Sequence, residues 1–269
     1  MDQDEKPLVQ NLKSDLQKGK ISRREFVRFA ALLGVSATVA MNFAGCEKKP
    51  EEQPAMKVKT GGTLRIAAPV QKVTHPAQFS WVSPTNQLRQ VAEYLTFTDA
   101  SNVTHPYLLK NWEASDDLKT WTLNLREGIK FNNGDEFNSD DVVFMFNQWL
   151  NKDVGSSMLG LMKGYLDPNG IEKAGTYKVV LHLKNPEIAV PEHLFHYPAM
   201  ILNSRTFEGD FIKKPHGTGP FTLDKYVEGE RVVLKKRNDY WNKDAAGNAL
   251  PYLDQVEFVD MGTEMAPMI

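Results

Sequence analysis

Short segments in which apolar and polar residues alternate recur between residues 61 and 260, and they constrain the fold more than any other feature of the chain. A two-residue period places successive side chains on opposite faces of an extended strand. In residues 119–126 the apolar positions are Trp121, Leu123 and Leu125, so this segment is predicted to be a strand with one buried face. Comparable patterns predict further strands at residues 63–67, 177–184, 221–223, 231–234 and 256–259.

A tight turn and a capped helix are predicted between these strands. The sequence Asn-Asn-Gly-Asp at residues 132–135 is typical of a tight turn. Ser139 is placed to cap a helix whose first turn carries Asp140 and Asp141, where the helix dipole favours negative charge. An apolar stripe then follows at helical spacing: Val142, Phe146, Trp149 and Leu150. Residues 84–95 show a second helical spacing, so the predicted class is mixed α/β.

Composition excludes several classes of protein. Of the 269 residues, 41% are hydrophobic and 25% are charged, which is typical of a globular chain and not of a disordered one. The formal net charge of −2 gives no basic excess for binding nucleic acid. The single cysteine, Cys46, excludes an internal disulfide framework and a multi-cysteine zinc site.

Residues 1–45 have the pattern of an export signal, and we expect them to stand apart from the folded domain. Arg23, Arg24 and Phe26 resemble the twin-arginine signal, which directs a folded protein to the twin-arginine export machinery. The uncharged stretch that follows is too short to span a bilayer, which needs about 20 apolar residues. The alternative is an amphipathic N-terminal helix with both arginines on its exposed face.

Cys46 follows this stretch within Phe-Ala-Gly-Cys at residues 43–46, which resembles a bacterial lipobox. In that interpretation the thiol is lipidated, and residues 46–60 form a charged, proline-containing tether between the membrane anchor and the domain. The alternative is a buried structural cysteine.

The sequence has no motif in which residues for catalysis or metal binding stand at the required spacing. His193 and His196 have helical spacing, but the sequence offers no third metal ligand and no HExxH motif. A nucleophile elbow, a phosphate-binding loop and a dinucleotide fingerprint are also missing from the sequence. We therefore predict no catalytic residue, no metal site and no cofactor.

Five segments, in order, resemble one family, the extracellular solute-binding proteins of family 5. The matching residues are 61–67, 109–117 with 121–131, 133–134 with 137–142, 217–221 and 237–241. The resemblance implies a periplasmic-binding-protein-like fold of type II, with two lobes around a ligand cleft. It also implies that residues 61–260 are the N-terminal half of such a fold and that residues 261–269 begin the second lobe, so we expect the chain to be a fragment.

The resemblance further implies the substrate-binding component of an ABC importer, held by its lipid anchor on the outer side of the cytoplasmic membrane. Its partners would be a small peptide-like solute and the permease subunits. By analogy of position, the cleft would be lined by Phe79, Ser80 and Trp81 and by Tyr165, His196 and Tyr197. Each of these aromatic residues could equally belong to the core. We assign Trp112, Trp121 and Trp149 to the core. For Gly217 and Gly219 we prefer a structural role in a turn to direct contact with the ligand.

Alternative functions remain open at this stage. Within the family, the ligand could be a nickel chelate or an oligosaccharide, because the charged groups that hold a peptide's ends come mostly from the second half in peptide-binding relatives. Outside it, the chain could be a secreted hydrolase or a surface module that keeps the fold without transport.

Overall fold

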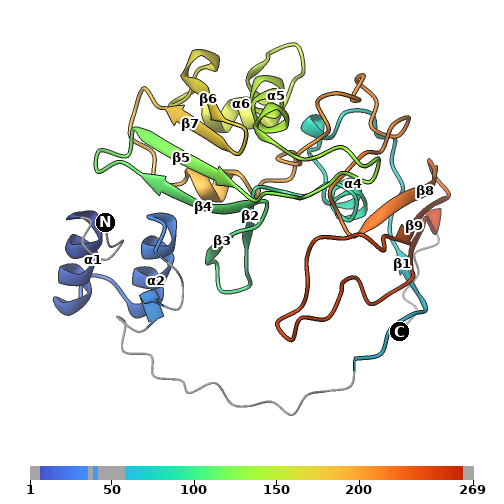
Figure 1. The fold of residues 1–269 in the computed structure, drawn as a ribbon, viewed down its shortest axis with the longest axis horizontal. Coiled ribbons are helices and arrows are strands. Elements are labelled where there is room, and N and C mark those ends of the chain that lie inside the picture. Colours follow the sequence, from blue (N-terminus) through green and yellow to red (C-terminus); the bar gives the residue numbers. More distant parts are fainter. Residues whose placement is uncertain (1–6, 36–38, 42–57, 263–269) are drawn as a thin grey trace.

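Two four-stranded sheets and a two-stranded ribbon organise the chain in the computed structural model, which describes residues 7–35, 39–41 and 58–262 (Figure 1). The ribbon pairs β2 (Thr96–Thr98) with β3 (Thr104–Pro106) in antiparallel fashion. Cys46 and residues 263–269 lie outside the described residues.

The first sheet is antiparallel and is built from a continuous stretch of sequence. It has the order β4 (Leu109–Ala114), β5 (Thr120–Leu125), β7 (Lys178–His182) and β6 (Ile171–Gly175). The inward-facing residues predicted for β5 are all buried, which confirms the strand and its orientation. The helix α5 (Ser139–Leu150) packs on β6 and β7, and α6 (Ser157–Met162) and the short helix η3 (Pro168–Gly170) follow it.

The start of α5 corrects one detail of the prediction. Ser139 is not the cap, because Asn138 has the extended conformation of an N-cap and its side chain accepts from the backbone N–H of Asp140 at 2.8 Å. The carboxylate of Asp141 accepts from the backbone N–H of Asn138 at 3.0 Å, which completes a capping box. The hydroxyl of Ser139 instead donates to the backbone oxygen of Gly175 at 2.6 Å, so it joins the helix to β6.

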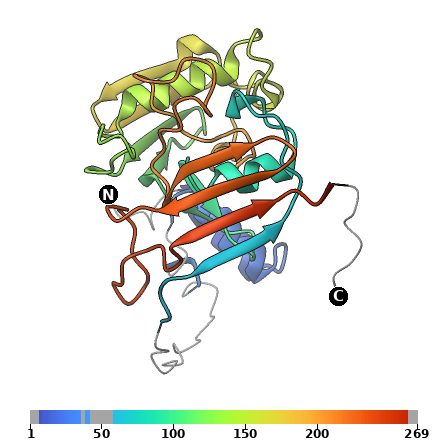
Figure 2. The same ribbon diagram turned by 90° about the vertical axis from the view of Figure 1, so that its right-hand side faces the viewer.

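The second sheet combines strands from the two ends of residues 63–259. Its order is β1 (Thr63–Ala67), β10 (Gln255–Val259), β9 (Arg231–Lys236) and β8 (Phe221–Val227). Figure 2 shows this sheet face on. β1 and β10 are parallel with Thr63 opposite Gln255, whereas β8, β9 and β10 pair in antiparallel fashion. The sequence offered no neighbour for the last strand, and the structure places it between β1 and β9.

The segment between the sheets departs from the predicted helix at residues 84–95. The helix α4 runs only from Val82 to Leu88, preceded by the short helix η2 (Pro76–Gln78). Beyond it, the carbonyls of Gln90 and Val91 accept from the N–H groups of Phe221 and Gly219, at 3.1 and 2.8 Å. These two carbonyls bond to a distant segment and not to N–H groups of a following helical turn. The helix therefore ends at Leu88, although the apolar residues after it stay buried.

Gly217 shows why this junction needs glycine. A Cβ atom at Gly217 would lie 1.9 Å from the backbone oxygen of Val91, and one at Gly219 would lie 2.5 Å from the oxygen of Gln90. These contacts support the structural role over the ligand-binding one. The tryptophans assigned to the core, Trp112, Trp121 and Trp149, are all buried.

The N-terminal segment differs from the expectation that it stands apart. Helices α1 (Pro7–Gln17) and α2 (Arg23–Leu32) form a hairpin that packs beside β3 and β4 (Figure 1). Arg23 and Arg24 are exposed, while Phe26 and Val27 are buried, so residues 23–32 have the amphipathic geometry of the alternative interpretation. None of the helices in the described ranges has the length and apolar character to cross a membrane.

Candidate ligand-binding site

The loop after β1 forms one side of a cavity of about 310 Å³ that includes three of the predicted residues. Phe79 is 6% exposed and packs inward, whereas Ser80 is exposed and the side chain of Trp81 is 67% exposed. A tryptophan this exposed offers flat apolar area to a ligand or to a covering segment.

Hydrogen bonds hold this loop in place from two sides. The Nδ1 atom of His75 accepts from the backbone N–H of Ala77 at 3.1 Å, so its Nε2–H donates to Oε1 of Gln148 at 3.0 Å. Burial lowers the pKa of His75, and the hydrogen bond to Gln148 opposes this only in part. The imidazole is therefore neutral. Gln78 donates to the backbone oxygen of Val154 at 2.8 Å and so fixes the loop against the segment between α5 and α6.

The other three predicted residues gather around the short helix α7 (Val190–His193). Tyr165 is 4% exposed, and its hydroxyl lies 3.0 Å from Nδ1 of His193, with the two rings stacked. His196 is half-buried, and its Nδ1 atom has no hydrogen-bond partner among the described residues. Tyr197 is 43% exposed, and its backbone oxygen accepts from the hydroxyl of Tyr94 at 3.4 Å. Tyr165 therefore offers almost no surface, and the unpartnered Nδ1 atom of His196 is itself buried, whereas Tyr197 offers an exposed ring.

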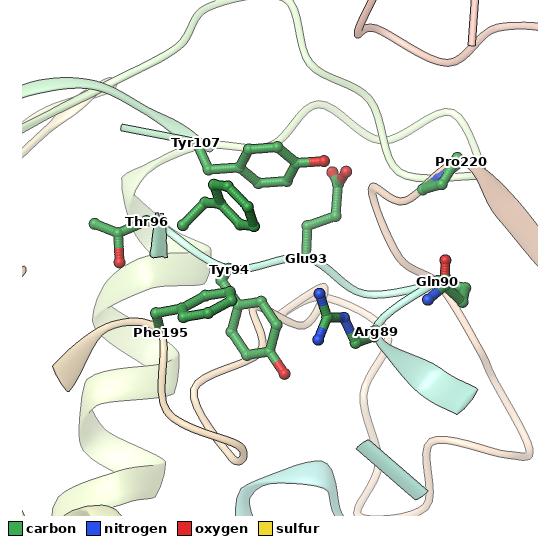
Figure 3. A pocket seen from close by; sticks show the side chains of 9 residues that line it. Arg89, Gln90, Glu93, Tyr94, Thr96, Tyr107, Phe195 and Pro220 are labelled. Atoms are coloured by element: carbon green, nitrogen blue, oxygen red, sulfur yellow. The ribbon is translucent and has the colours of Figure 1, made fainter. Parts of the chain in front are cut away.

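A second cavity, of about 280 Å³, was not found by sequence reasoning (Figure 3). Aromatic side chains line much of it, with one cation and one carboxylate among them: Tyr94, Phe97, Tyr107, Phe195, Arg89 and Glu93. The guanidinium of Arg89 lies 5.9 Å from the ring centre of Phe195. Phe195 lies directly before the predicted His196, so this cavity adjoins the residues around α7 described above.

Glu93 is the buried carboxyl group that lines this cavity. Its carboxylate accepts from the hydroxyl of Tyr240 and from Nε1 of Trp241, the latter at 2.9 Å. Burial raises the pKa of Glu93, and these hydrogen bonds oppose the rise. Because the hydroxyl hydrogen of Tyr240 is used on Glu93, the hydroxyl of Tyr107 donates to that of Tyr240 at 3.0 Å, and burial also raises the pKa of Tyr107. Nothing in the sequence near Glu93 pointed to this arrangement, because its partners Tyr240 and Trp241 lie 147 and 148 residues away.

Metal ligands are not clustered in the described parts of the chain. No group of three or more His, Cys, Asp or Glu side chains there is arranged to hold a metal ion. Burial lowers the pKa values of His193 and His196, so both imidazoles are neutral near pH 7.

Comparison of solved structures defines the class of protein. The fold matches the ABC transporter-associated periplasmic binding protein DppA from Helicobacter pylori, solved with the peptide STSA, with a TM-score of 0.63 and 24% identity. That match covers 76% of this chain and 43% of the other chain. An ABC transporter substrate-binding protein from Sinorhizobium meliloti matches with a TM-score of 0.63 and 25% identity over 74% of this chain and 39% of the other. The predicted fold class is confirmed: a mixed α/β part of a two-lobed periplasmic binding protein.

The family follows from the sequence comparison. Residues 103–268 match the model of the bacterial extracellular solute-binding proteins, family 5 Middle. This match spans more than half of the chain, and the chain belongs to that family of solute-binding proteins.

Curated relatives carry several ligand names. A probable ABC transporter-binding protein of Deinococcus radiodurans is 28% identical over 87% of this chain and 42% of its own length. Di/tripeptide-binding protein 1 of Pseudomonas aeruginosa is 33% identical over 52% of this chain and 30% of its length. The nickel-binding periplasmic protein of Escherichia coli is 31% identical over 58% of this chain and 30% of its length. The chain thus spans well under half the length of the relatives that it matches.

Proposed function

We propose that this chain is the N-terminal portion of the substrate-binding component of an ABC importer that captures peptide-like solutes outside the cytoplasmic membrane. The observation that carries this proposal is the family match over residues 103–268, together with relatives named for dipeptide and tripeptide binding. In such a receptor, a ligand that contacts both lobes stabilises the closed form, and the permease distinguishes that form from the open one.

The site would lie where exposed aromatic rings accompany polar groups. Trp81 and Tyr197 offer apolar area, and each has a polar neighbour in the chain, the exposed Ser80 and the half-buried His196. Flat aromatic surfaces accept varied side chains because they require no particular pattern of polar partners, which suits a receptor for peptides of different sequence.

Calorimetric titration with trialanine tests this assignment. We expect weak binding by the 269-residue chain, because one lobe cannot enclose a solute, and tighter binding by a form extended to the length of its relatives. In the extended form, Trp81→Ala and Tyr197→Ala should each weaken binding by about tenfold, which corresponds to about 1.4 kcal/mol. Phe97→Ala, which removes a comparably exposed ring from the other cavity, serves as the control.

The titration can contradict the proposal in two ways. An extended form that binds none of a panel of dipeptides and tripeptides would exclude the peptide ligand. A loss of affinity in Phe97→Ala without a loss in Trp81→Ala would move the site to the cavity beside Glu93.

A nickel chelate is a second candidate ligand. The observation in its favour is His196, a half-buried imidazole that is neutral because burial lowers its pKa and that lies beside the ring of Tyr197. Neutral imidazole is a good ligand for nickel. Titration of the extended form with nickel and L-histidine, compared with trialanine, separates the two candidates, and His196→Ala should abolish the nickel response while only weakening trialanine binding.

Export and anchoring complete the proposal. Arg23, Arg24 and Phe26 would direct the chain to the twin-arginine export machinery, and Cys46 would carry the lipid that holds residues 46–60 at the membrane. Labelling cells with radioactive palmitate tests the anchor: label should enter the wild type and not Cys46→Ser. Replacement of Arg23 and Arg24 by lysine should leave the precursor in the cytoplasm, and a periplasmic product from this variant would contradict the twin-arginine route.

A further inference from the structure

The helical hairpin of α1 and α2 has a shared apolar interior that includes residues of the lobe. Its buried members on the hairpin are Val9, Phe26, Val27, Ala30, Ala31 and Leu33. Val103, between β2 and β3, is buried in the same cluster, and Leu118 and Ile188 pack against it. We name Val103, Trp112, Leu118, Ile188 and Glu192 the docking face, because each of them contacts the hairpin. Figure 1 shows α2 beside β3 and β4.

Directional hydrogen bonds fix the position of α2 on the docking face. Nε and Nη2 of Arg28 both donate to Oε1 of Glu192, at 3.0 and 2.8 Å. At the other end of the helix, Nε1 of Trp112 donates to the backbone oxygen of Leu32 at 2.9 Å. That oxygen belongs to the last turn of α2, where carbonyls have no partner within the helix, so the lobe supplies the missing donor.

The backbone also approaches the lobe closely just after α2. Gly34 has a φ of +87°, and a Cβ atom there would lie 2.8 Å from the backbone oxygen of Trp112. A glycine is therefore required at this point both by its conformation and by the contact. Apolar packing alone could tolerate a shift of the helix, but the Arg28, Leu32 and Gly34 contacts together define one position.

The contacts divide the N-terminal segment into a hidden part and a displayed part. The side chains of Phe26, Val27 and Ala30 are buried, and those of Arg23 and Arg24 are exposed. Arg24 donates to the backbone oxygen of Ser101 at 3.4 Å while remaining exposed. The apolar face of α2 is thus covered, and the arginine pair is exposed to solvent.

We propose that the docking face is an intramolecular receptor for the α1–α2 hairpin, which shields the apolar face of α2 while leaving Arg23 and Arg24 accessible. The docking face joins residues 103–192, which come together only when the β4–β5–β7–β6 sheet and α7 have formed. Docking therefore reports that the lobe has folded. The role of docking in export rests on the proposed signal function, whereas the docking of the hairpin does not depend on that function.

Hydrogen–deuterium exchange of the full 269-residue chain tests the docking. On the hairpin, Phe26→Ala should speed exchange of the amides of residues 27–33 by about tenfold or more, because it removes the largest buried side chain of the contact. Gln10→Ala, an exposed position on α1, is its control and should leave exchange unchanged. Amides of β5 should keep their wild-type protection in both variants.

Variants on the lobe side complete the design. Val103→Asp should expose residues 27–33 as strongly as Phe26→Ala, and Glu192→Gln should do so more weakly, by about two- to fivefold, because its ion pair is partly exposed. Glu208→Gln, which alters a surface ion pair with Lys214, is the matched control. Protection of residues 27–33 that is unchanged in Phe26→Ala and Val103→Asp, or that is already as low in the wild type as in urea, would overturn the proposal.

Measuring export of the wild type and of the same variants distinguishes the proposed docking from the proposed twin-arginine signal. Wild-type protection with no export through the twin-arginine route would leave the docking standing and refute the signal function. Export without any protection in the wild type would do the reverse.

Discussion

The two four-stranded sheets of the lobe differ in how they are assembled. The β4–β5–β7–β6 sheet uses residues 109–182, and each of its pairings is antiparallel. The β1–β10–β9–β8 sheet joins β1 to β10 across 192 residues, and β1 is largely exposed. One sheet is thus completed by nearby sequence and covered by its own helix α5, while the edge strand of the other retains exposed side chains.

This difference indicates which of the two sheets contributes more to the free energy of unfolding. A sheet whose strands are close in sequence costs little loop-closure entropy, and α5 buries one of its faces. The mixed sheet can pair β1 only after the rest of the lobe has formed. We therefore expect substitutions in the local sheet to change global stability most and substitutions in β1 to change it least.

Trp121→Ala should have the largest effect. Trp121 is fully buried on β5, and loss of a buried tryptophan removes apolar contacts and leaves a cavity, which costs about 3–5 kcal/mol. Urea unfolding followed by circular dichroism measures the change in the free energy of unfolding. A loss below 1 kcal/mol would show that the local sheet does not dominate stability.

Gly217→Ala should come next, because it disrupts the junction between the sheets. The added Cβ would meet a backbone oxygen and not a movable side chain, so the chain must shift at a cost of about 1–3 kcal/mol. Thermal unfolding measures the effect. Gly209→Ala is unsuitable as a control because its φ is positive, whereas Gly160→Ala, in the open space around α6, should be neutral or slightly stabilising.

Glu93 should make stability depend on pH. Burial raises the pKa of Glu93 in the folded chain above its ordinary value of 4.5, so the folded state retains a proton that the unfolded state loses. This contribution to the free energy of unfolding is complete below pH 4.5 and falls as the pH rises through the folded-state pKa.

The comparison with Glu93→Gln isolates that effect. The wild-type free energy of unfolding, minus that of Glu93→Gln, should decrease from pH 4.5 towards pH 8 in urea titrations. Glu208→Gln is a control, since Glu208 is fully exposed and its pKa is lowered by Lys214. A difference between wild type and Glu93→Gln that rises with pH would contradict the burial of Glu93.

Leu64→Ala should have the smallest effect and so sharpens the contrast with Trp121→Ala. Leu64 is 45% exposed on β1, and truncation there should cost less than about 1 kcal/mol in the 269-residue chain. Urea unfolding again measures it. A loss similar to that of Trp121→Ala would mean that both sheets carry the stability of the lobe equally.

Local sequence predicted the strands well but placed the helix ends poorly. The alternation around Trp121 and the stripe in α5 depend on side chains within one element, and both are confirmed. The helix at residues 84–95 was wrong beyond Leu88, because carbonyls of Gln90 and Val91 bond to a glycine segment more than 120 residues away. The cap of α5 was displaced by one residue, because Asn and Ser are both good caps and only the backbone distinguishes them.

The candidate site was predicted by position and only partly by chemistry. The loop at Phe79, Ser80 and Trp81 does line a cavity, while their part in ligand binding stays a prediction. The cavity beside Glu93 was missed, because its walls come from three distant segments and a glutamate within an apolar run carries no local signal.

The sequence by itself determined the class of fold, the buried faces of its strands and the family, since periodicity and ordered motifs are properties of neighbouring residues. Only the tertiary structure decided the parallel pairing of β1 with β10, the burial of Glu93 beneath Tyr240 and Trp241, and the docking of α2 against Trp112 and Glu192. The physical reason is that these contacts join residues separated by 80 to nearly 200 positions. Their formation depends on the whole lobe closing and not on any preference that a short segment carries.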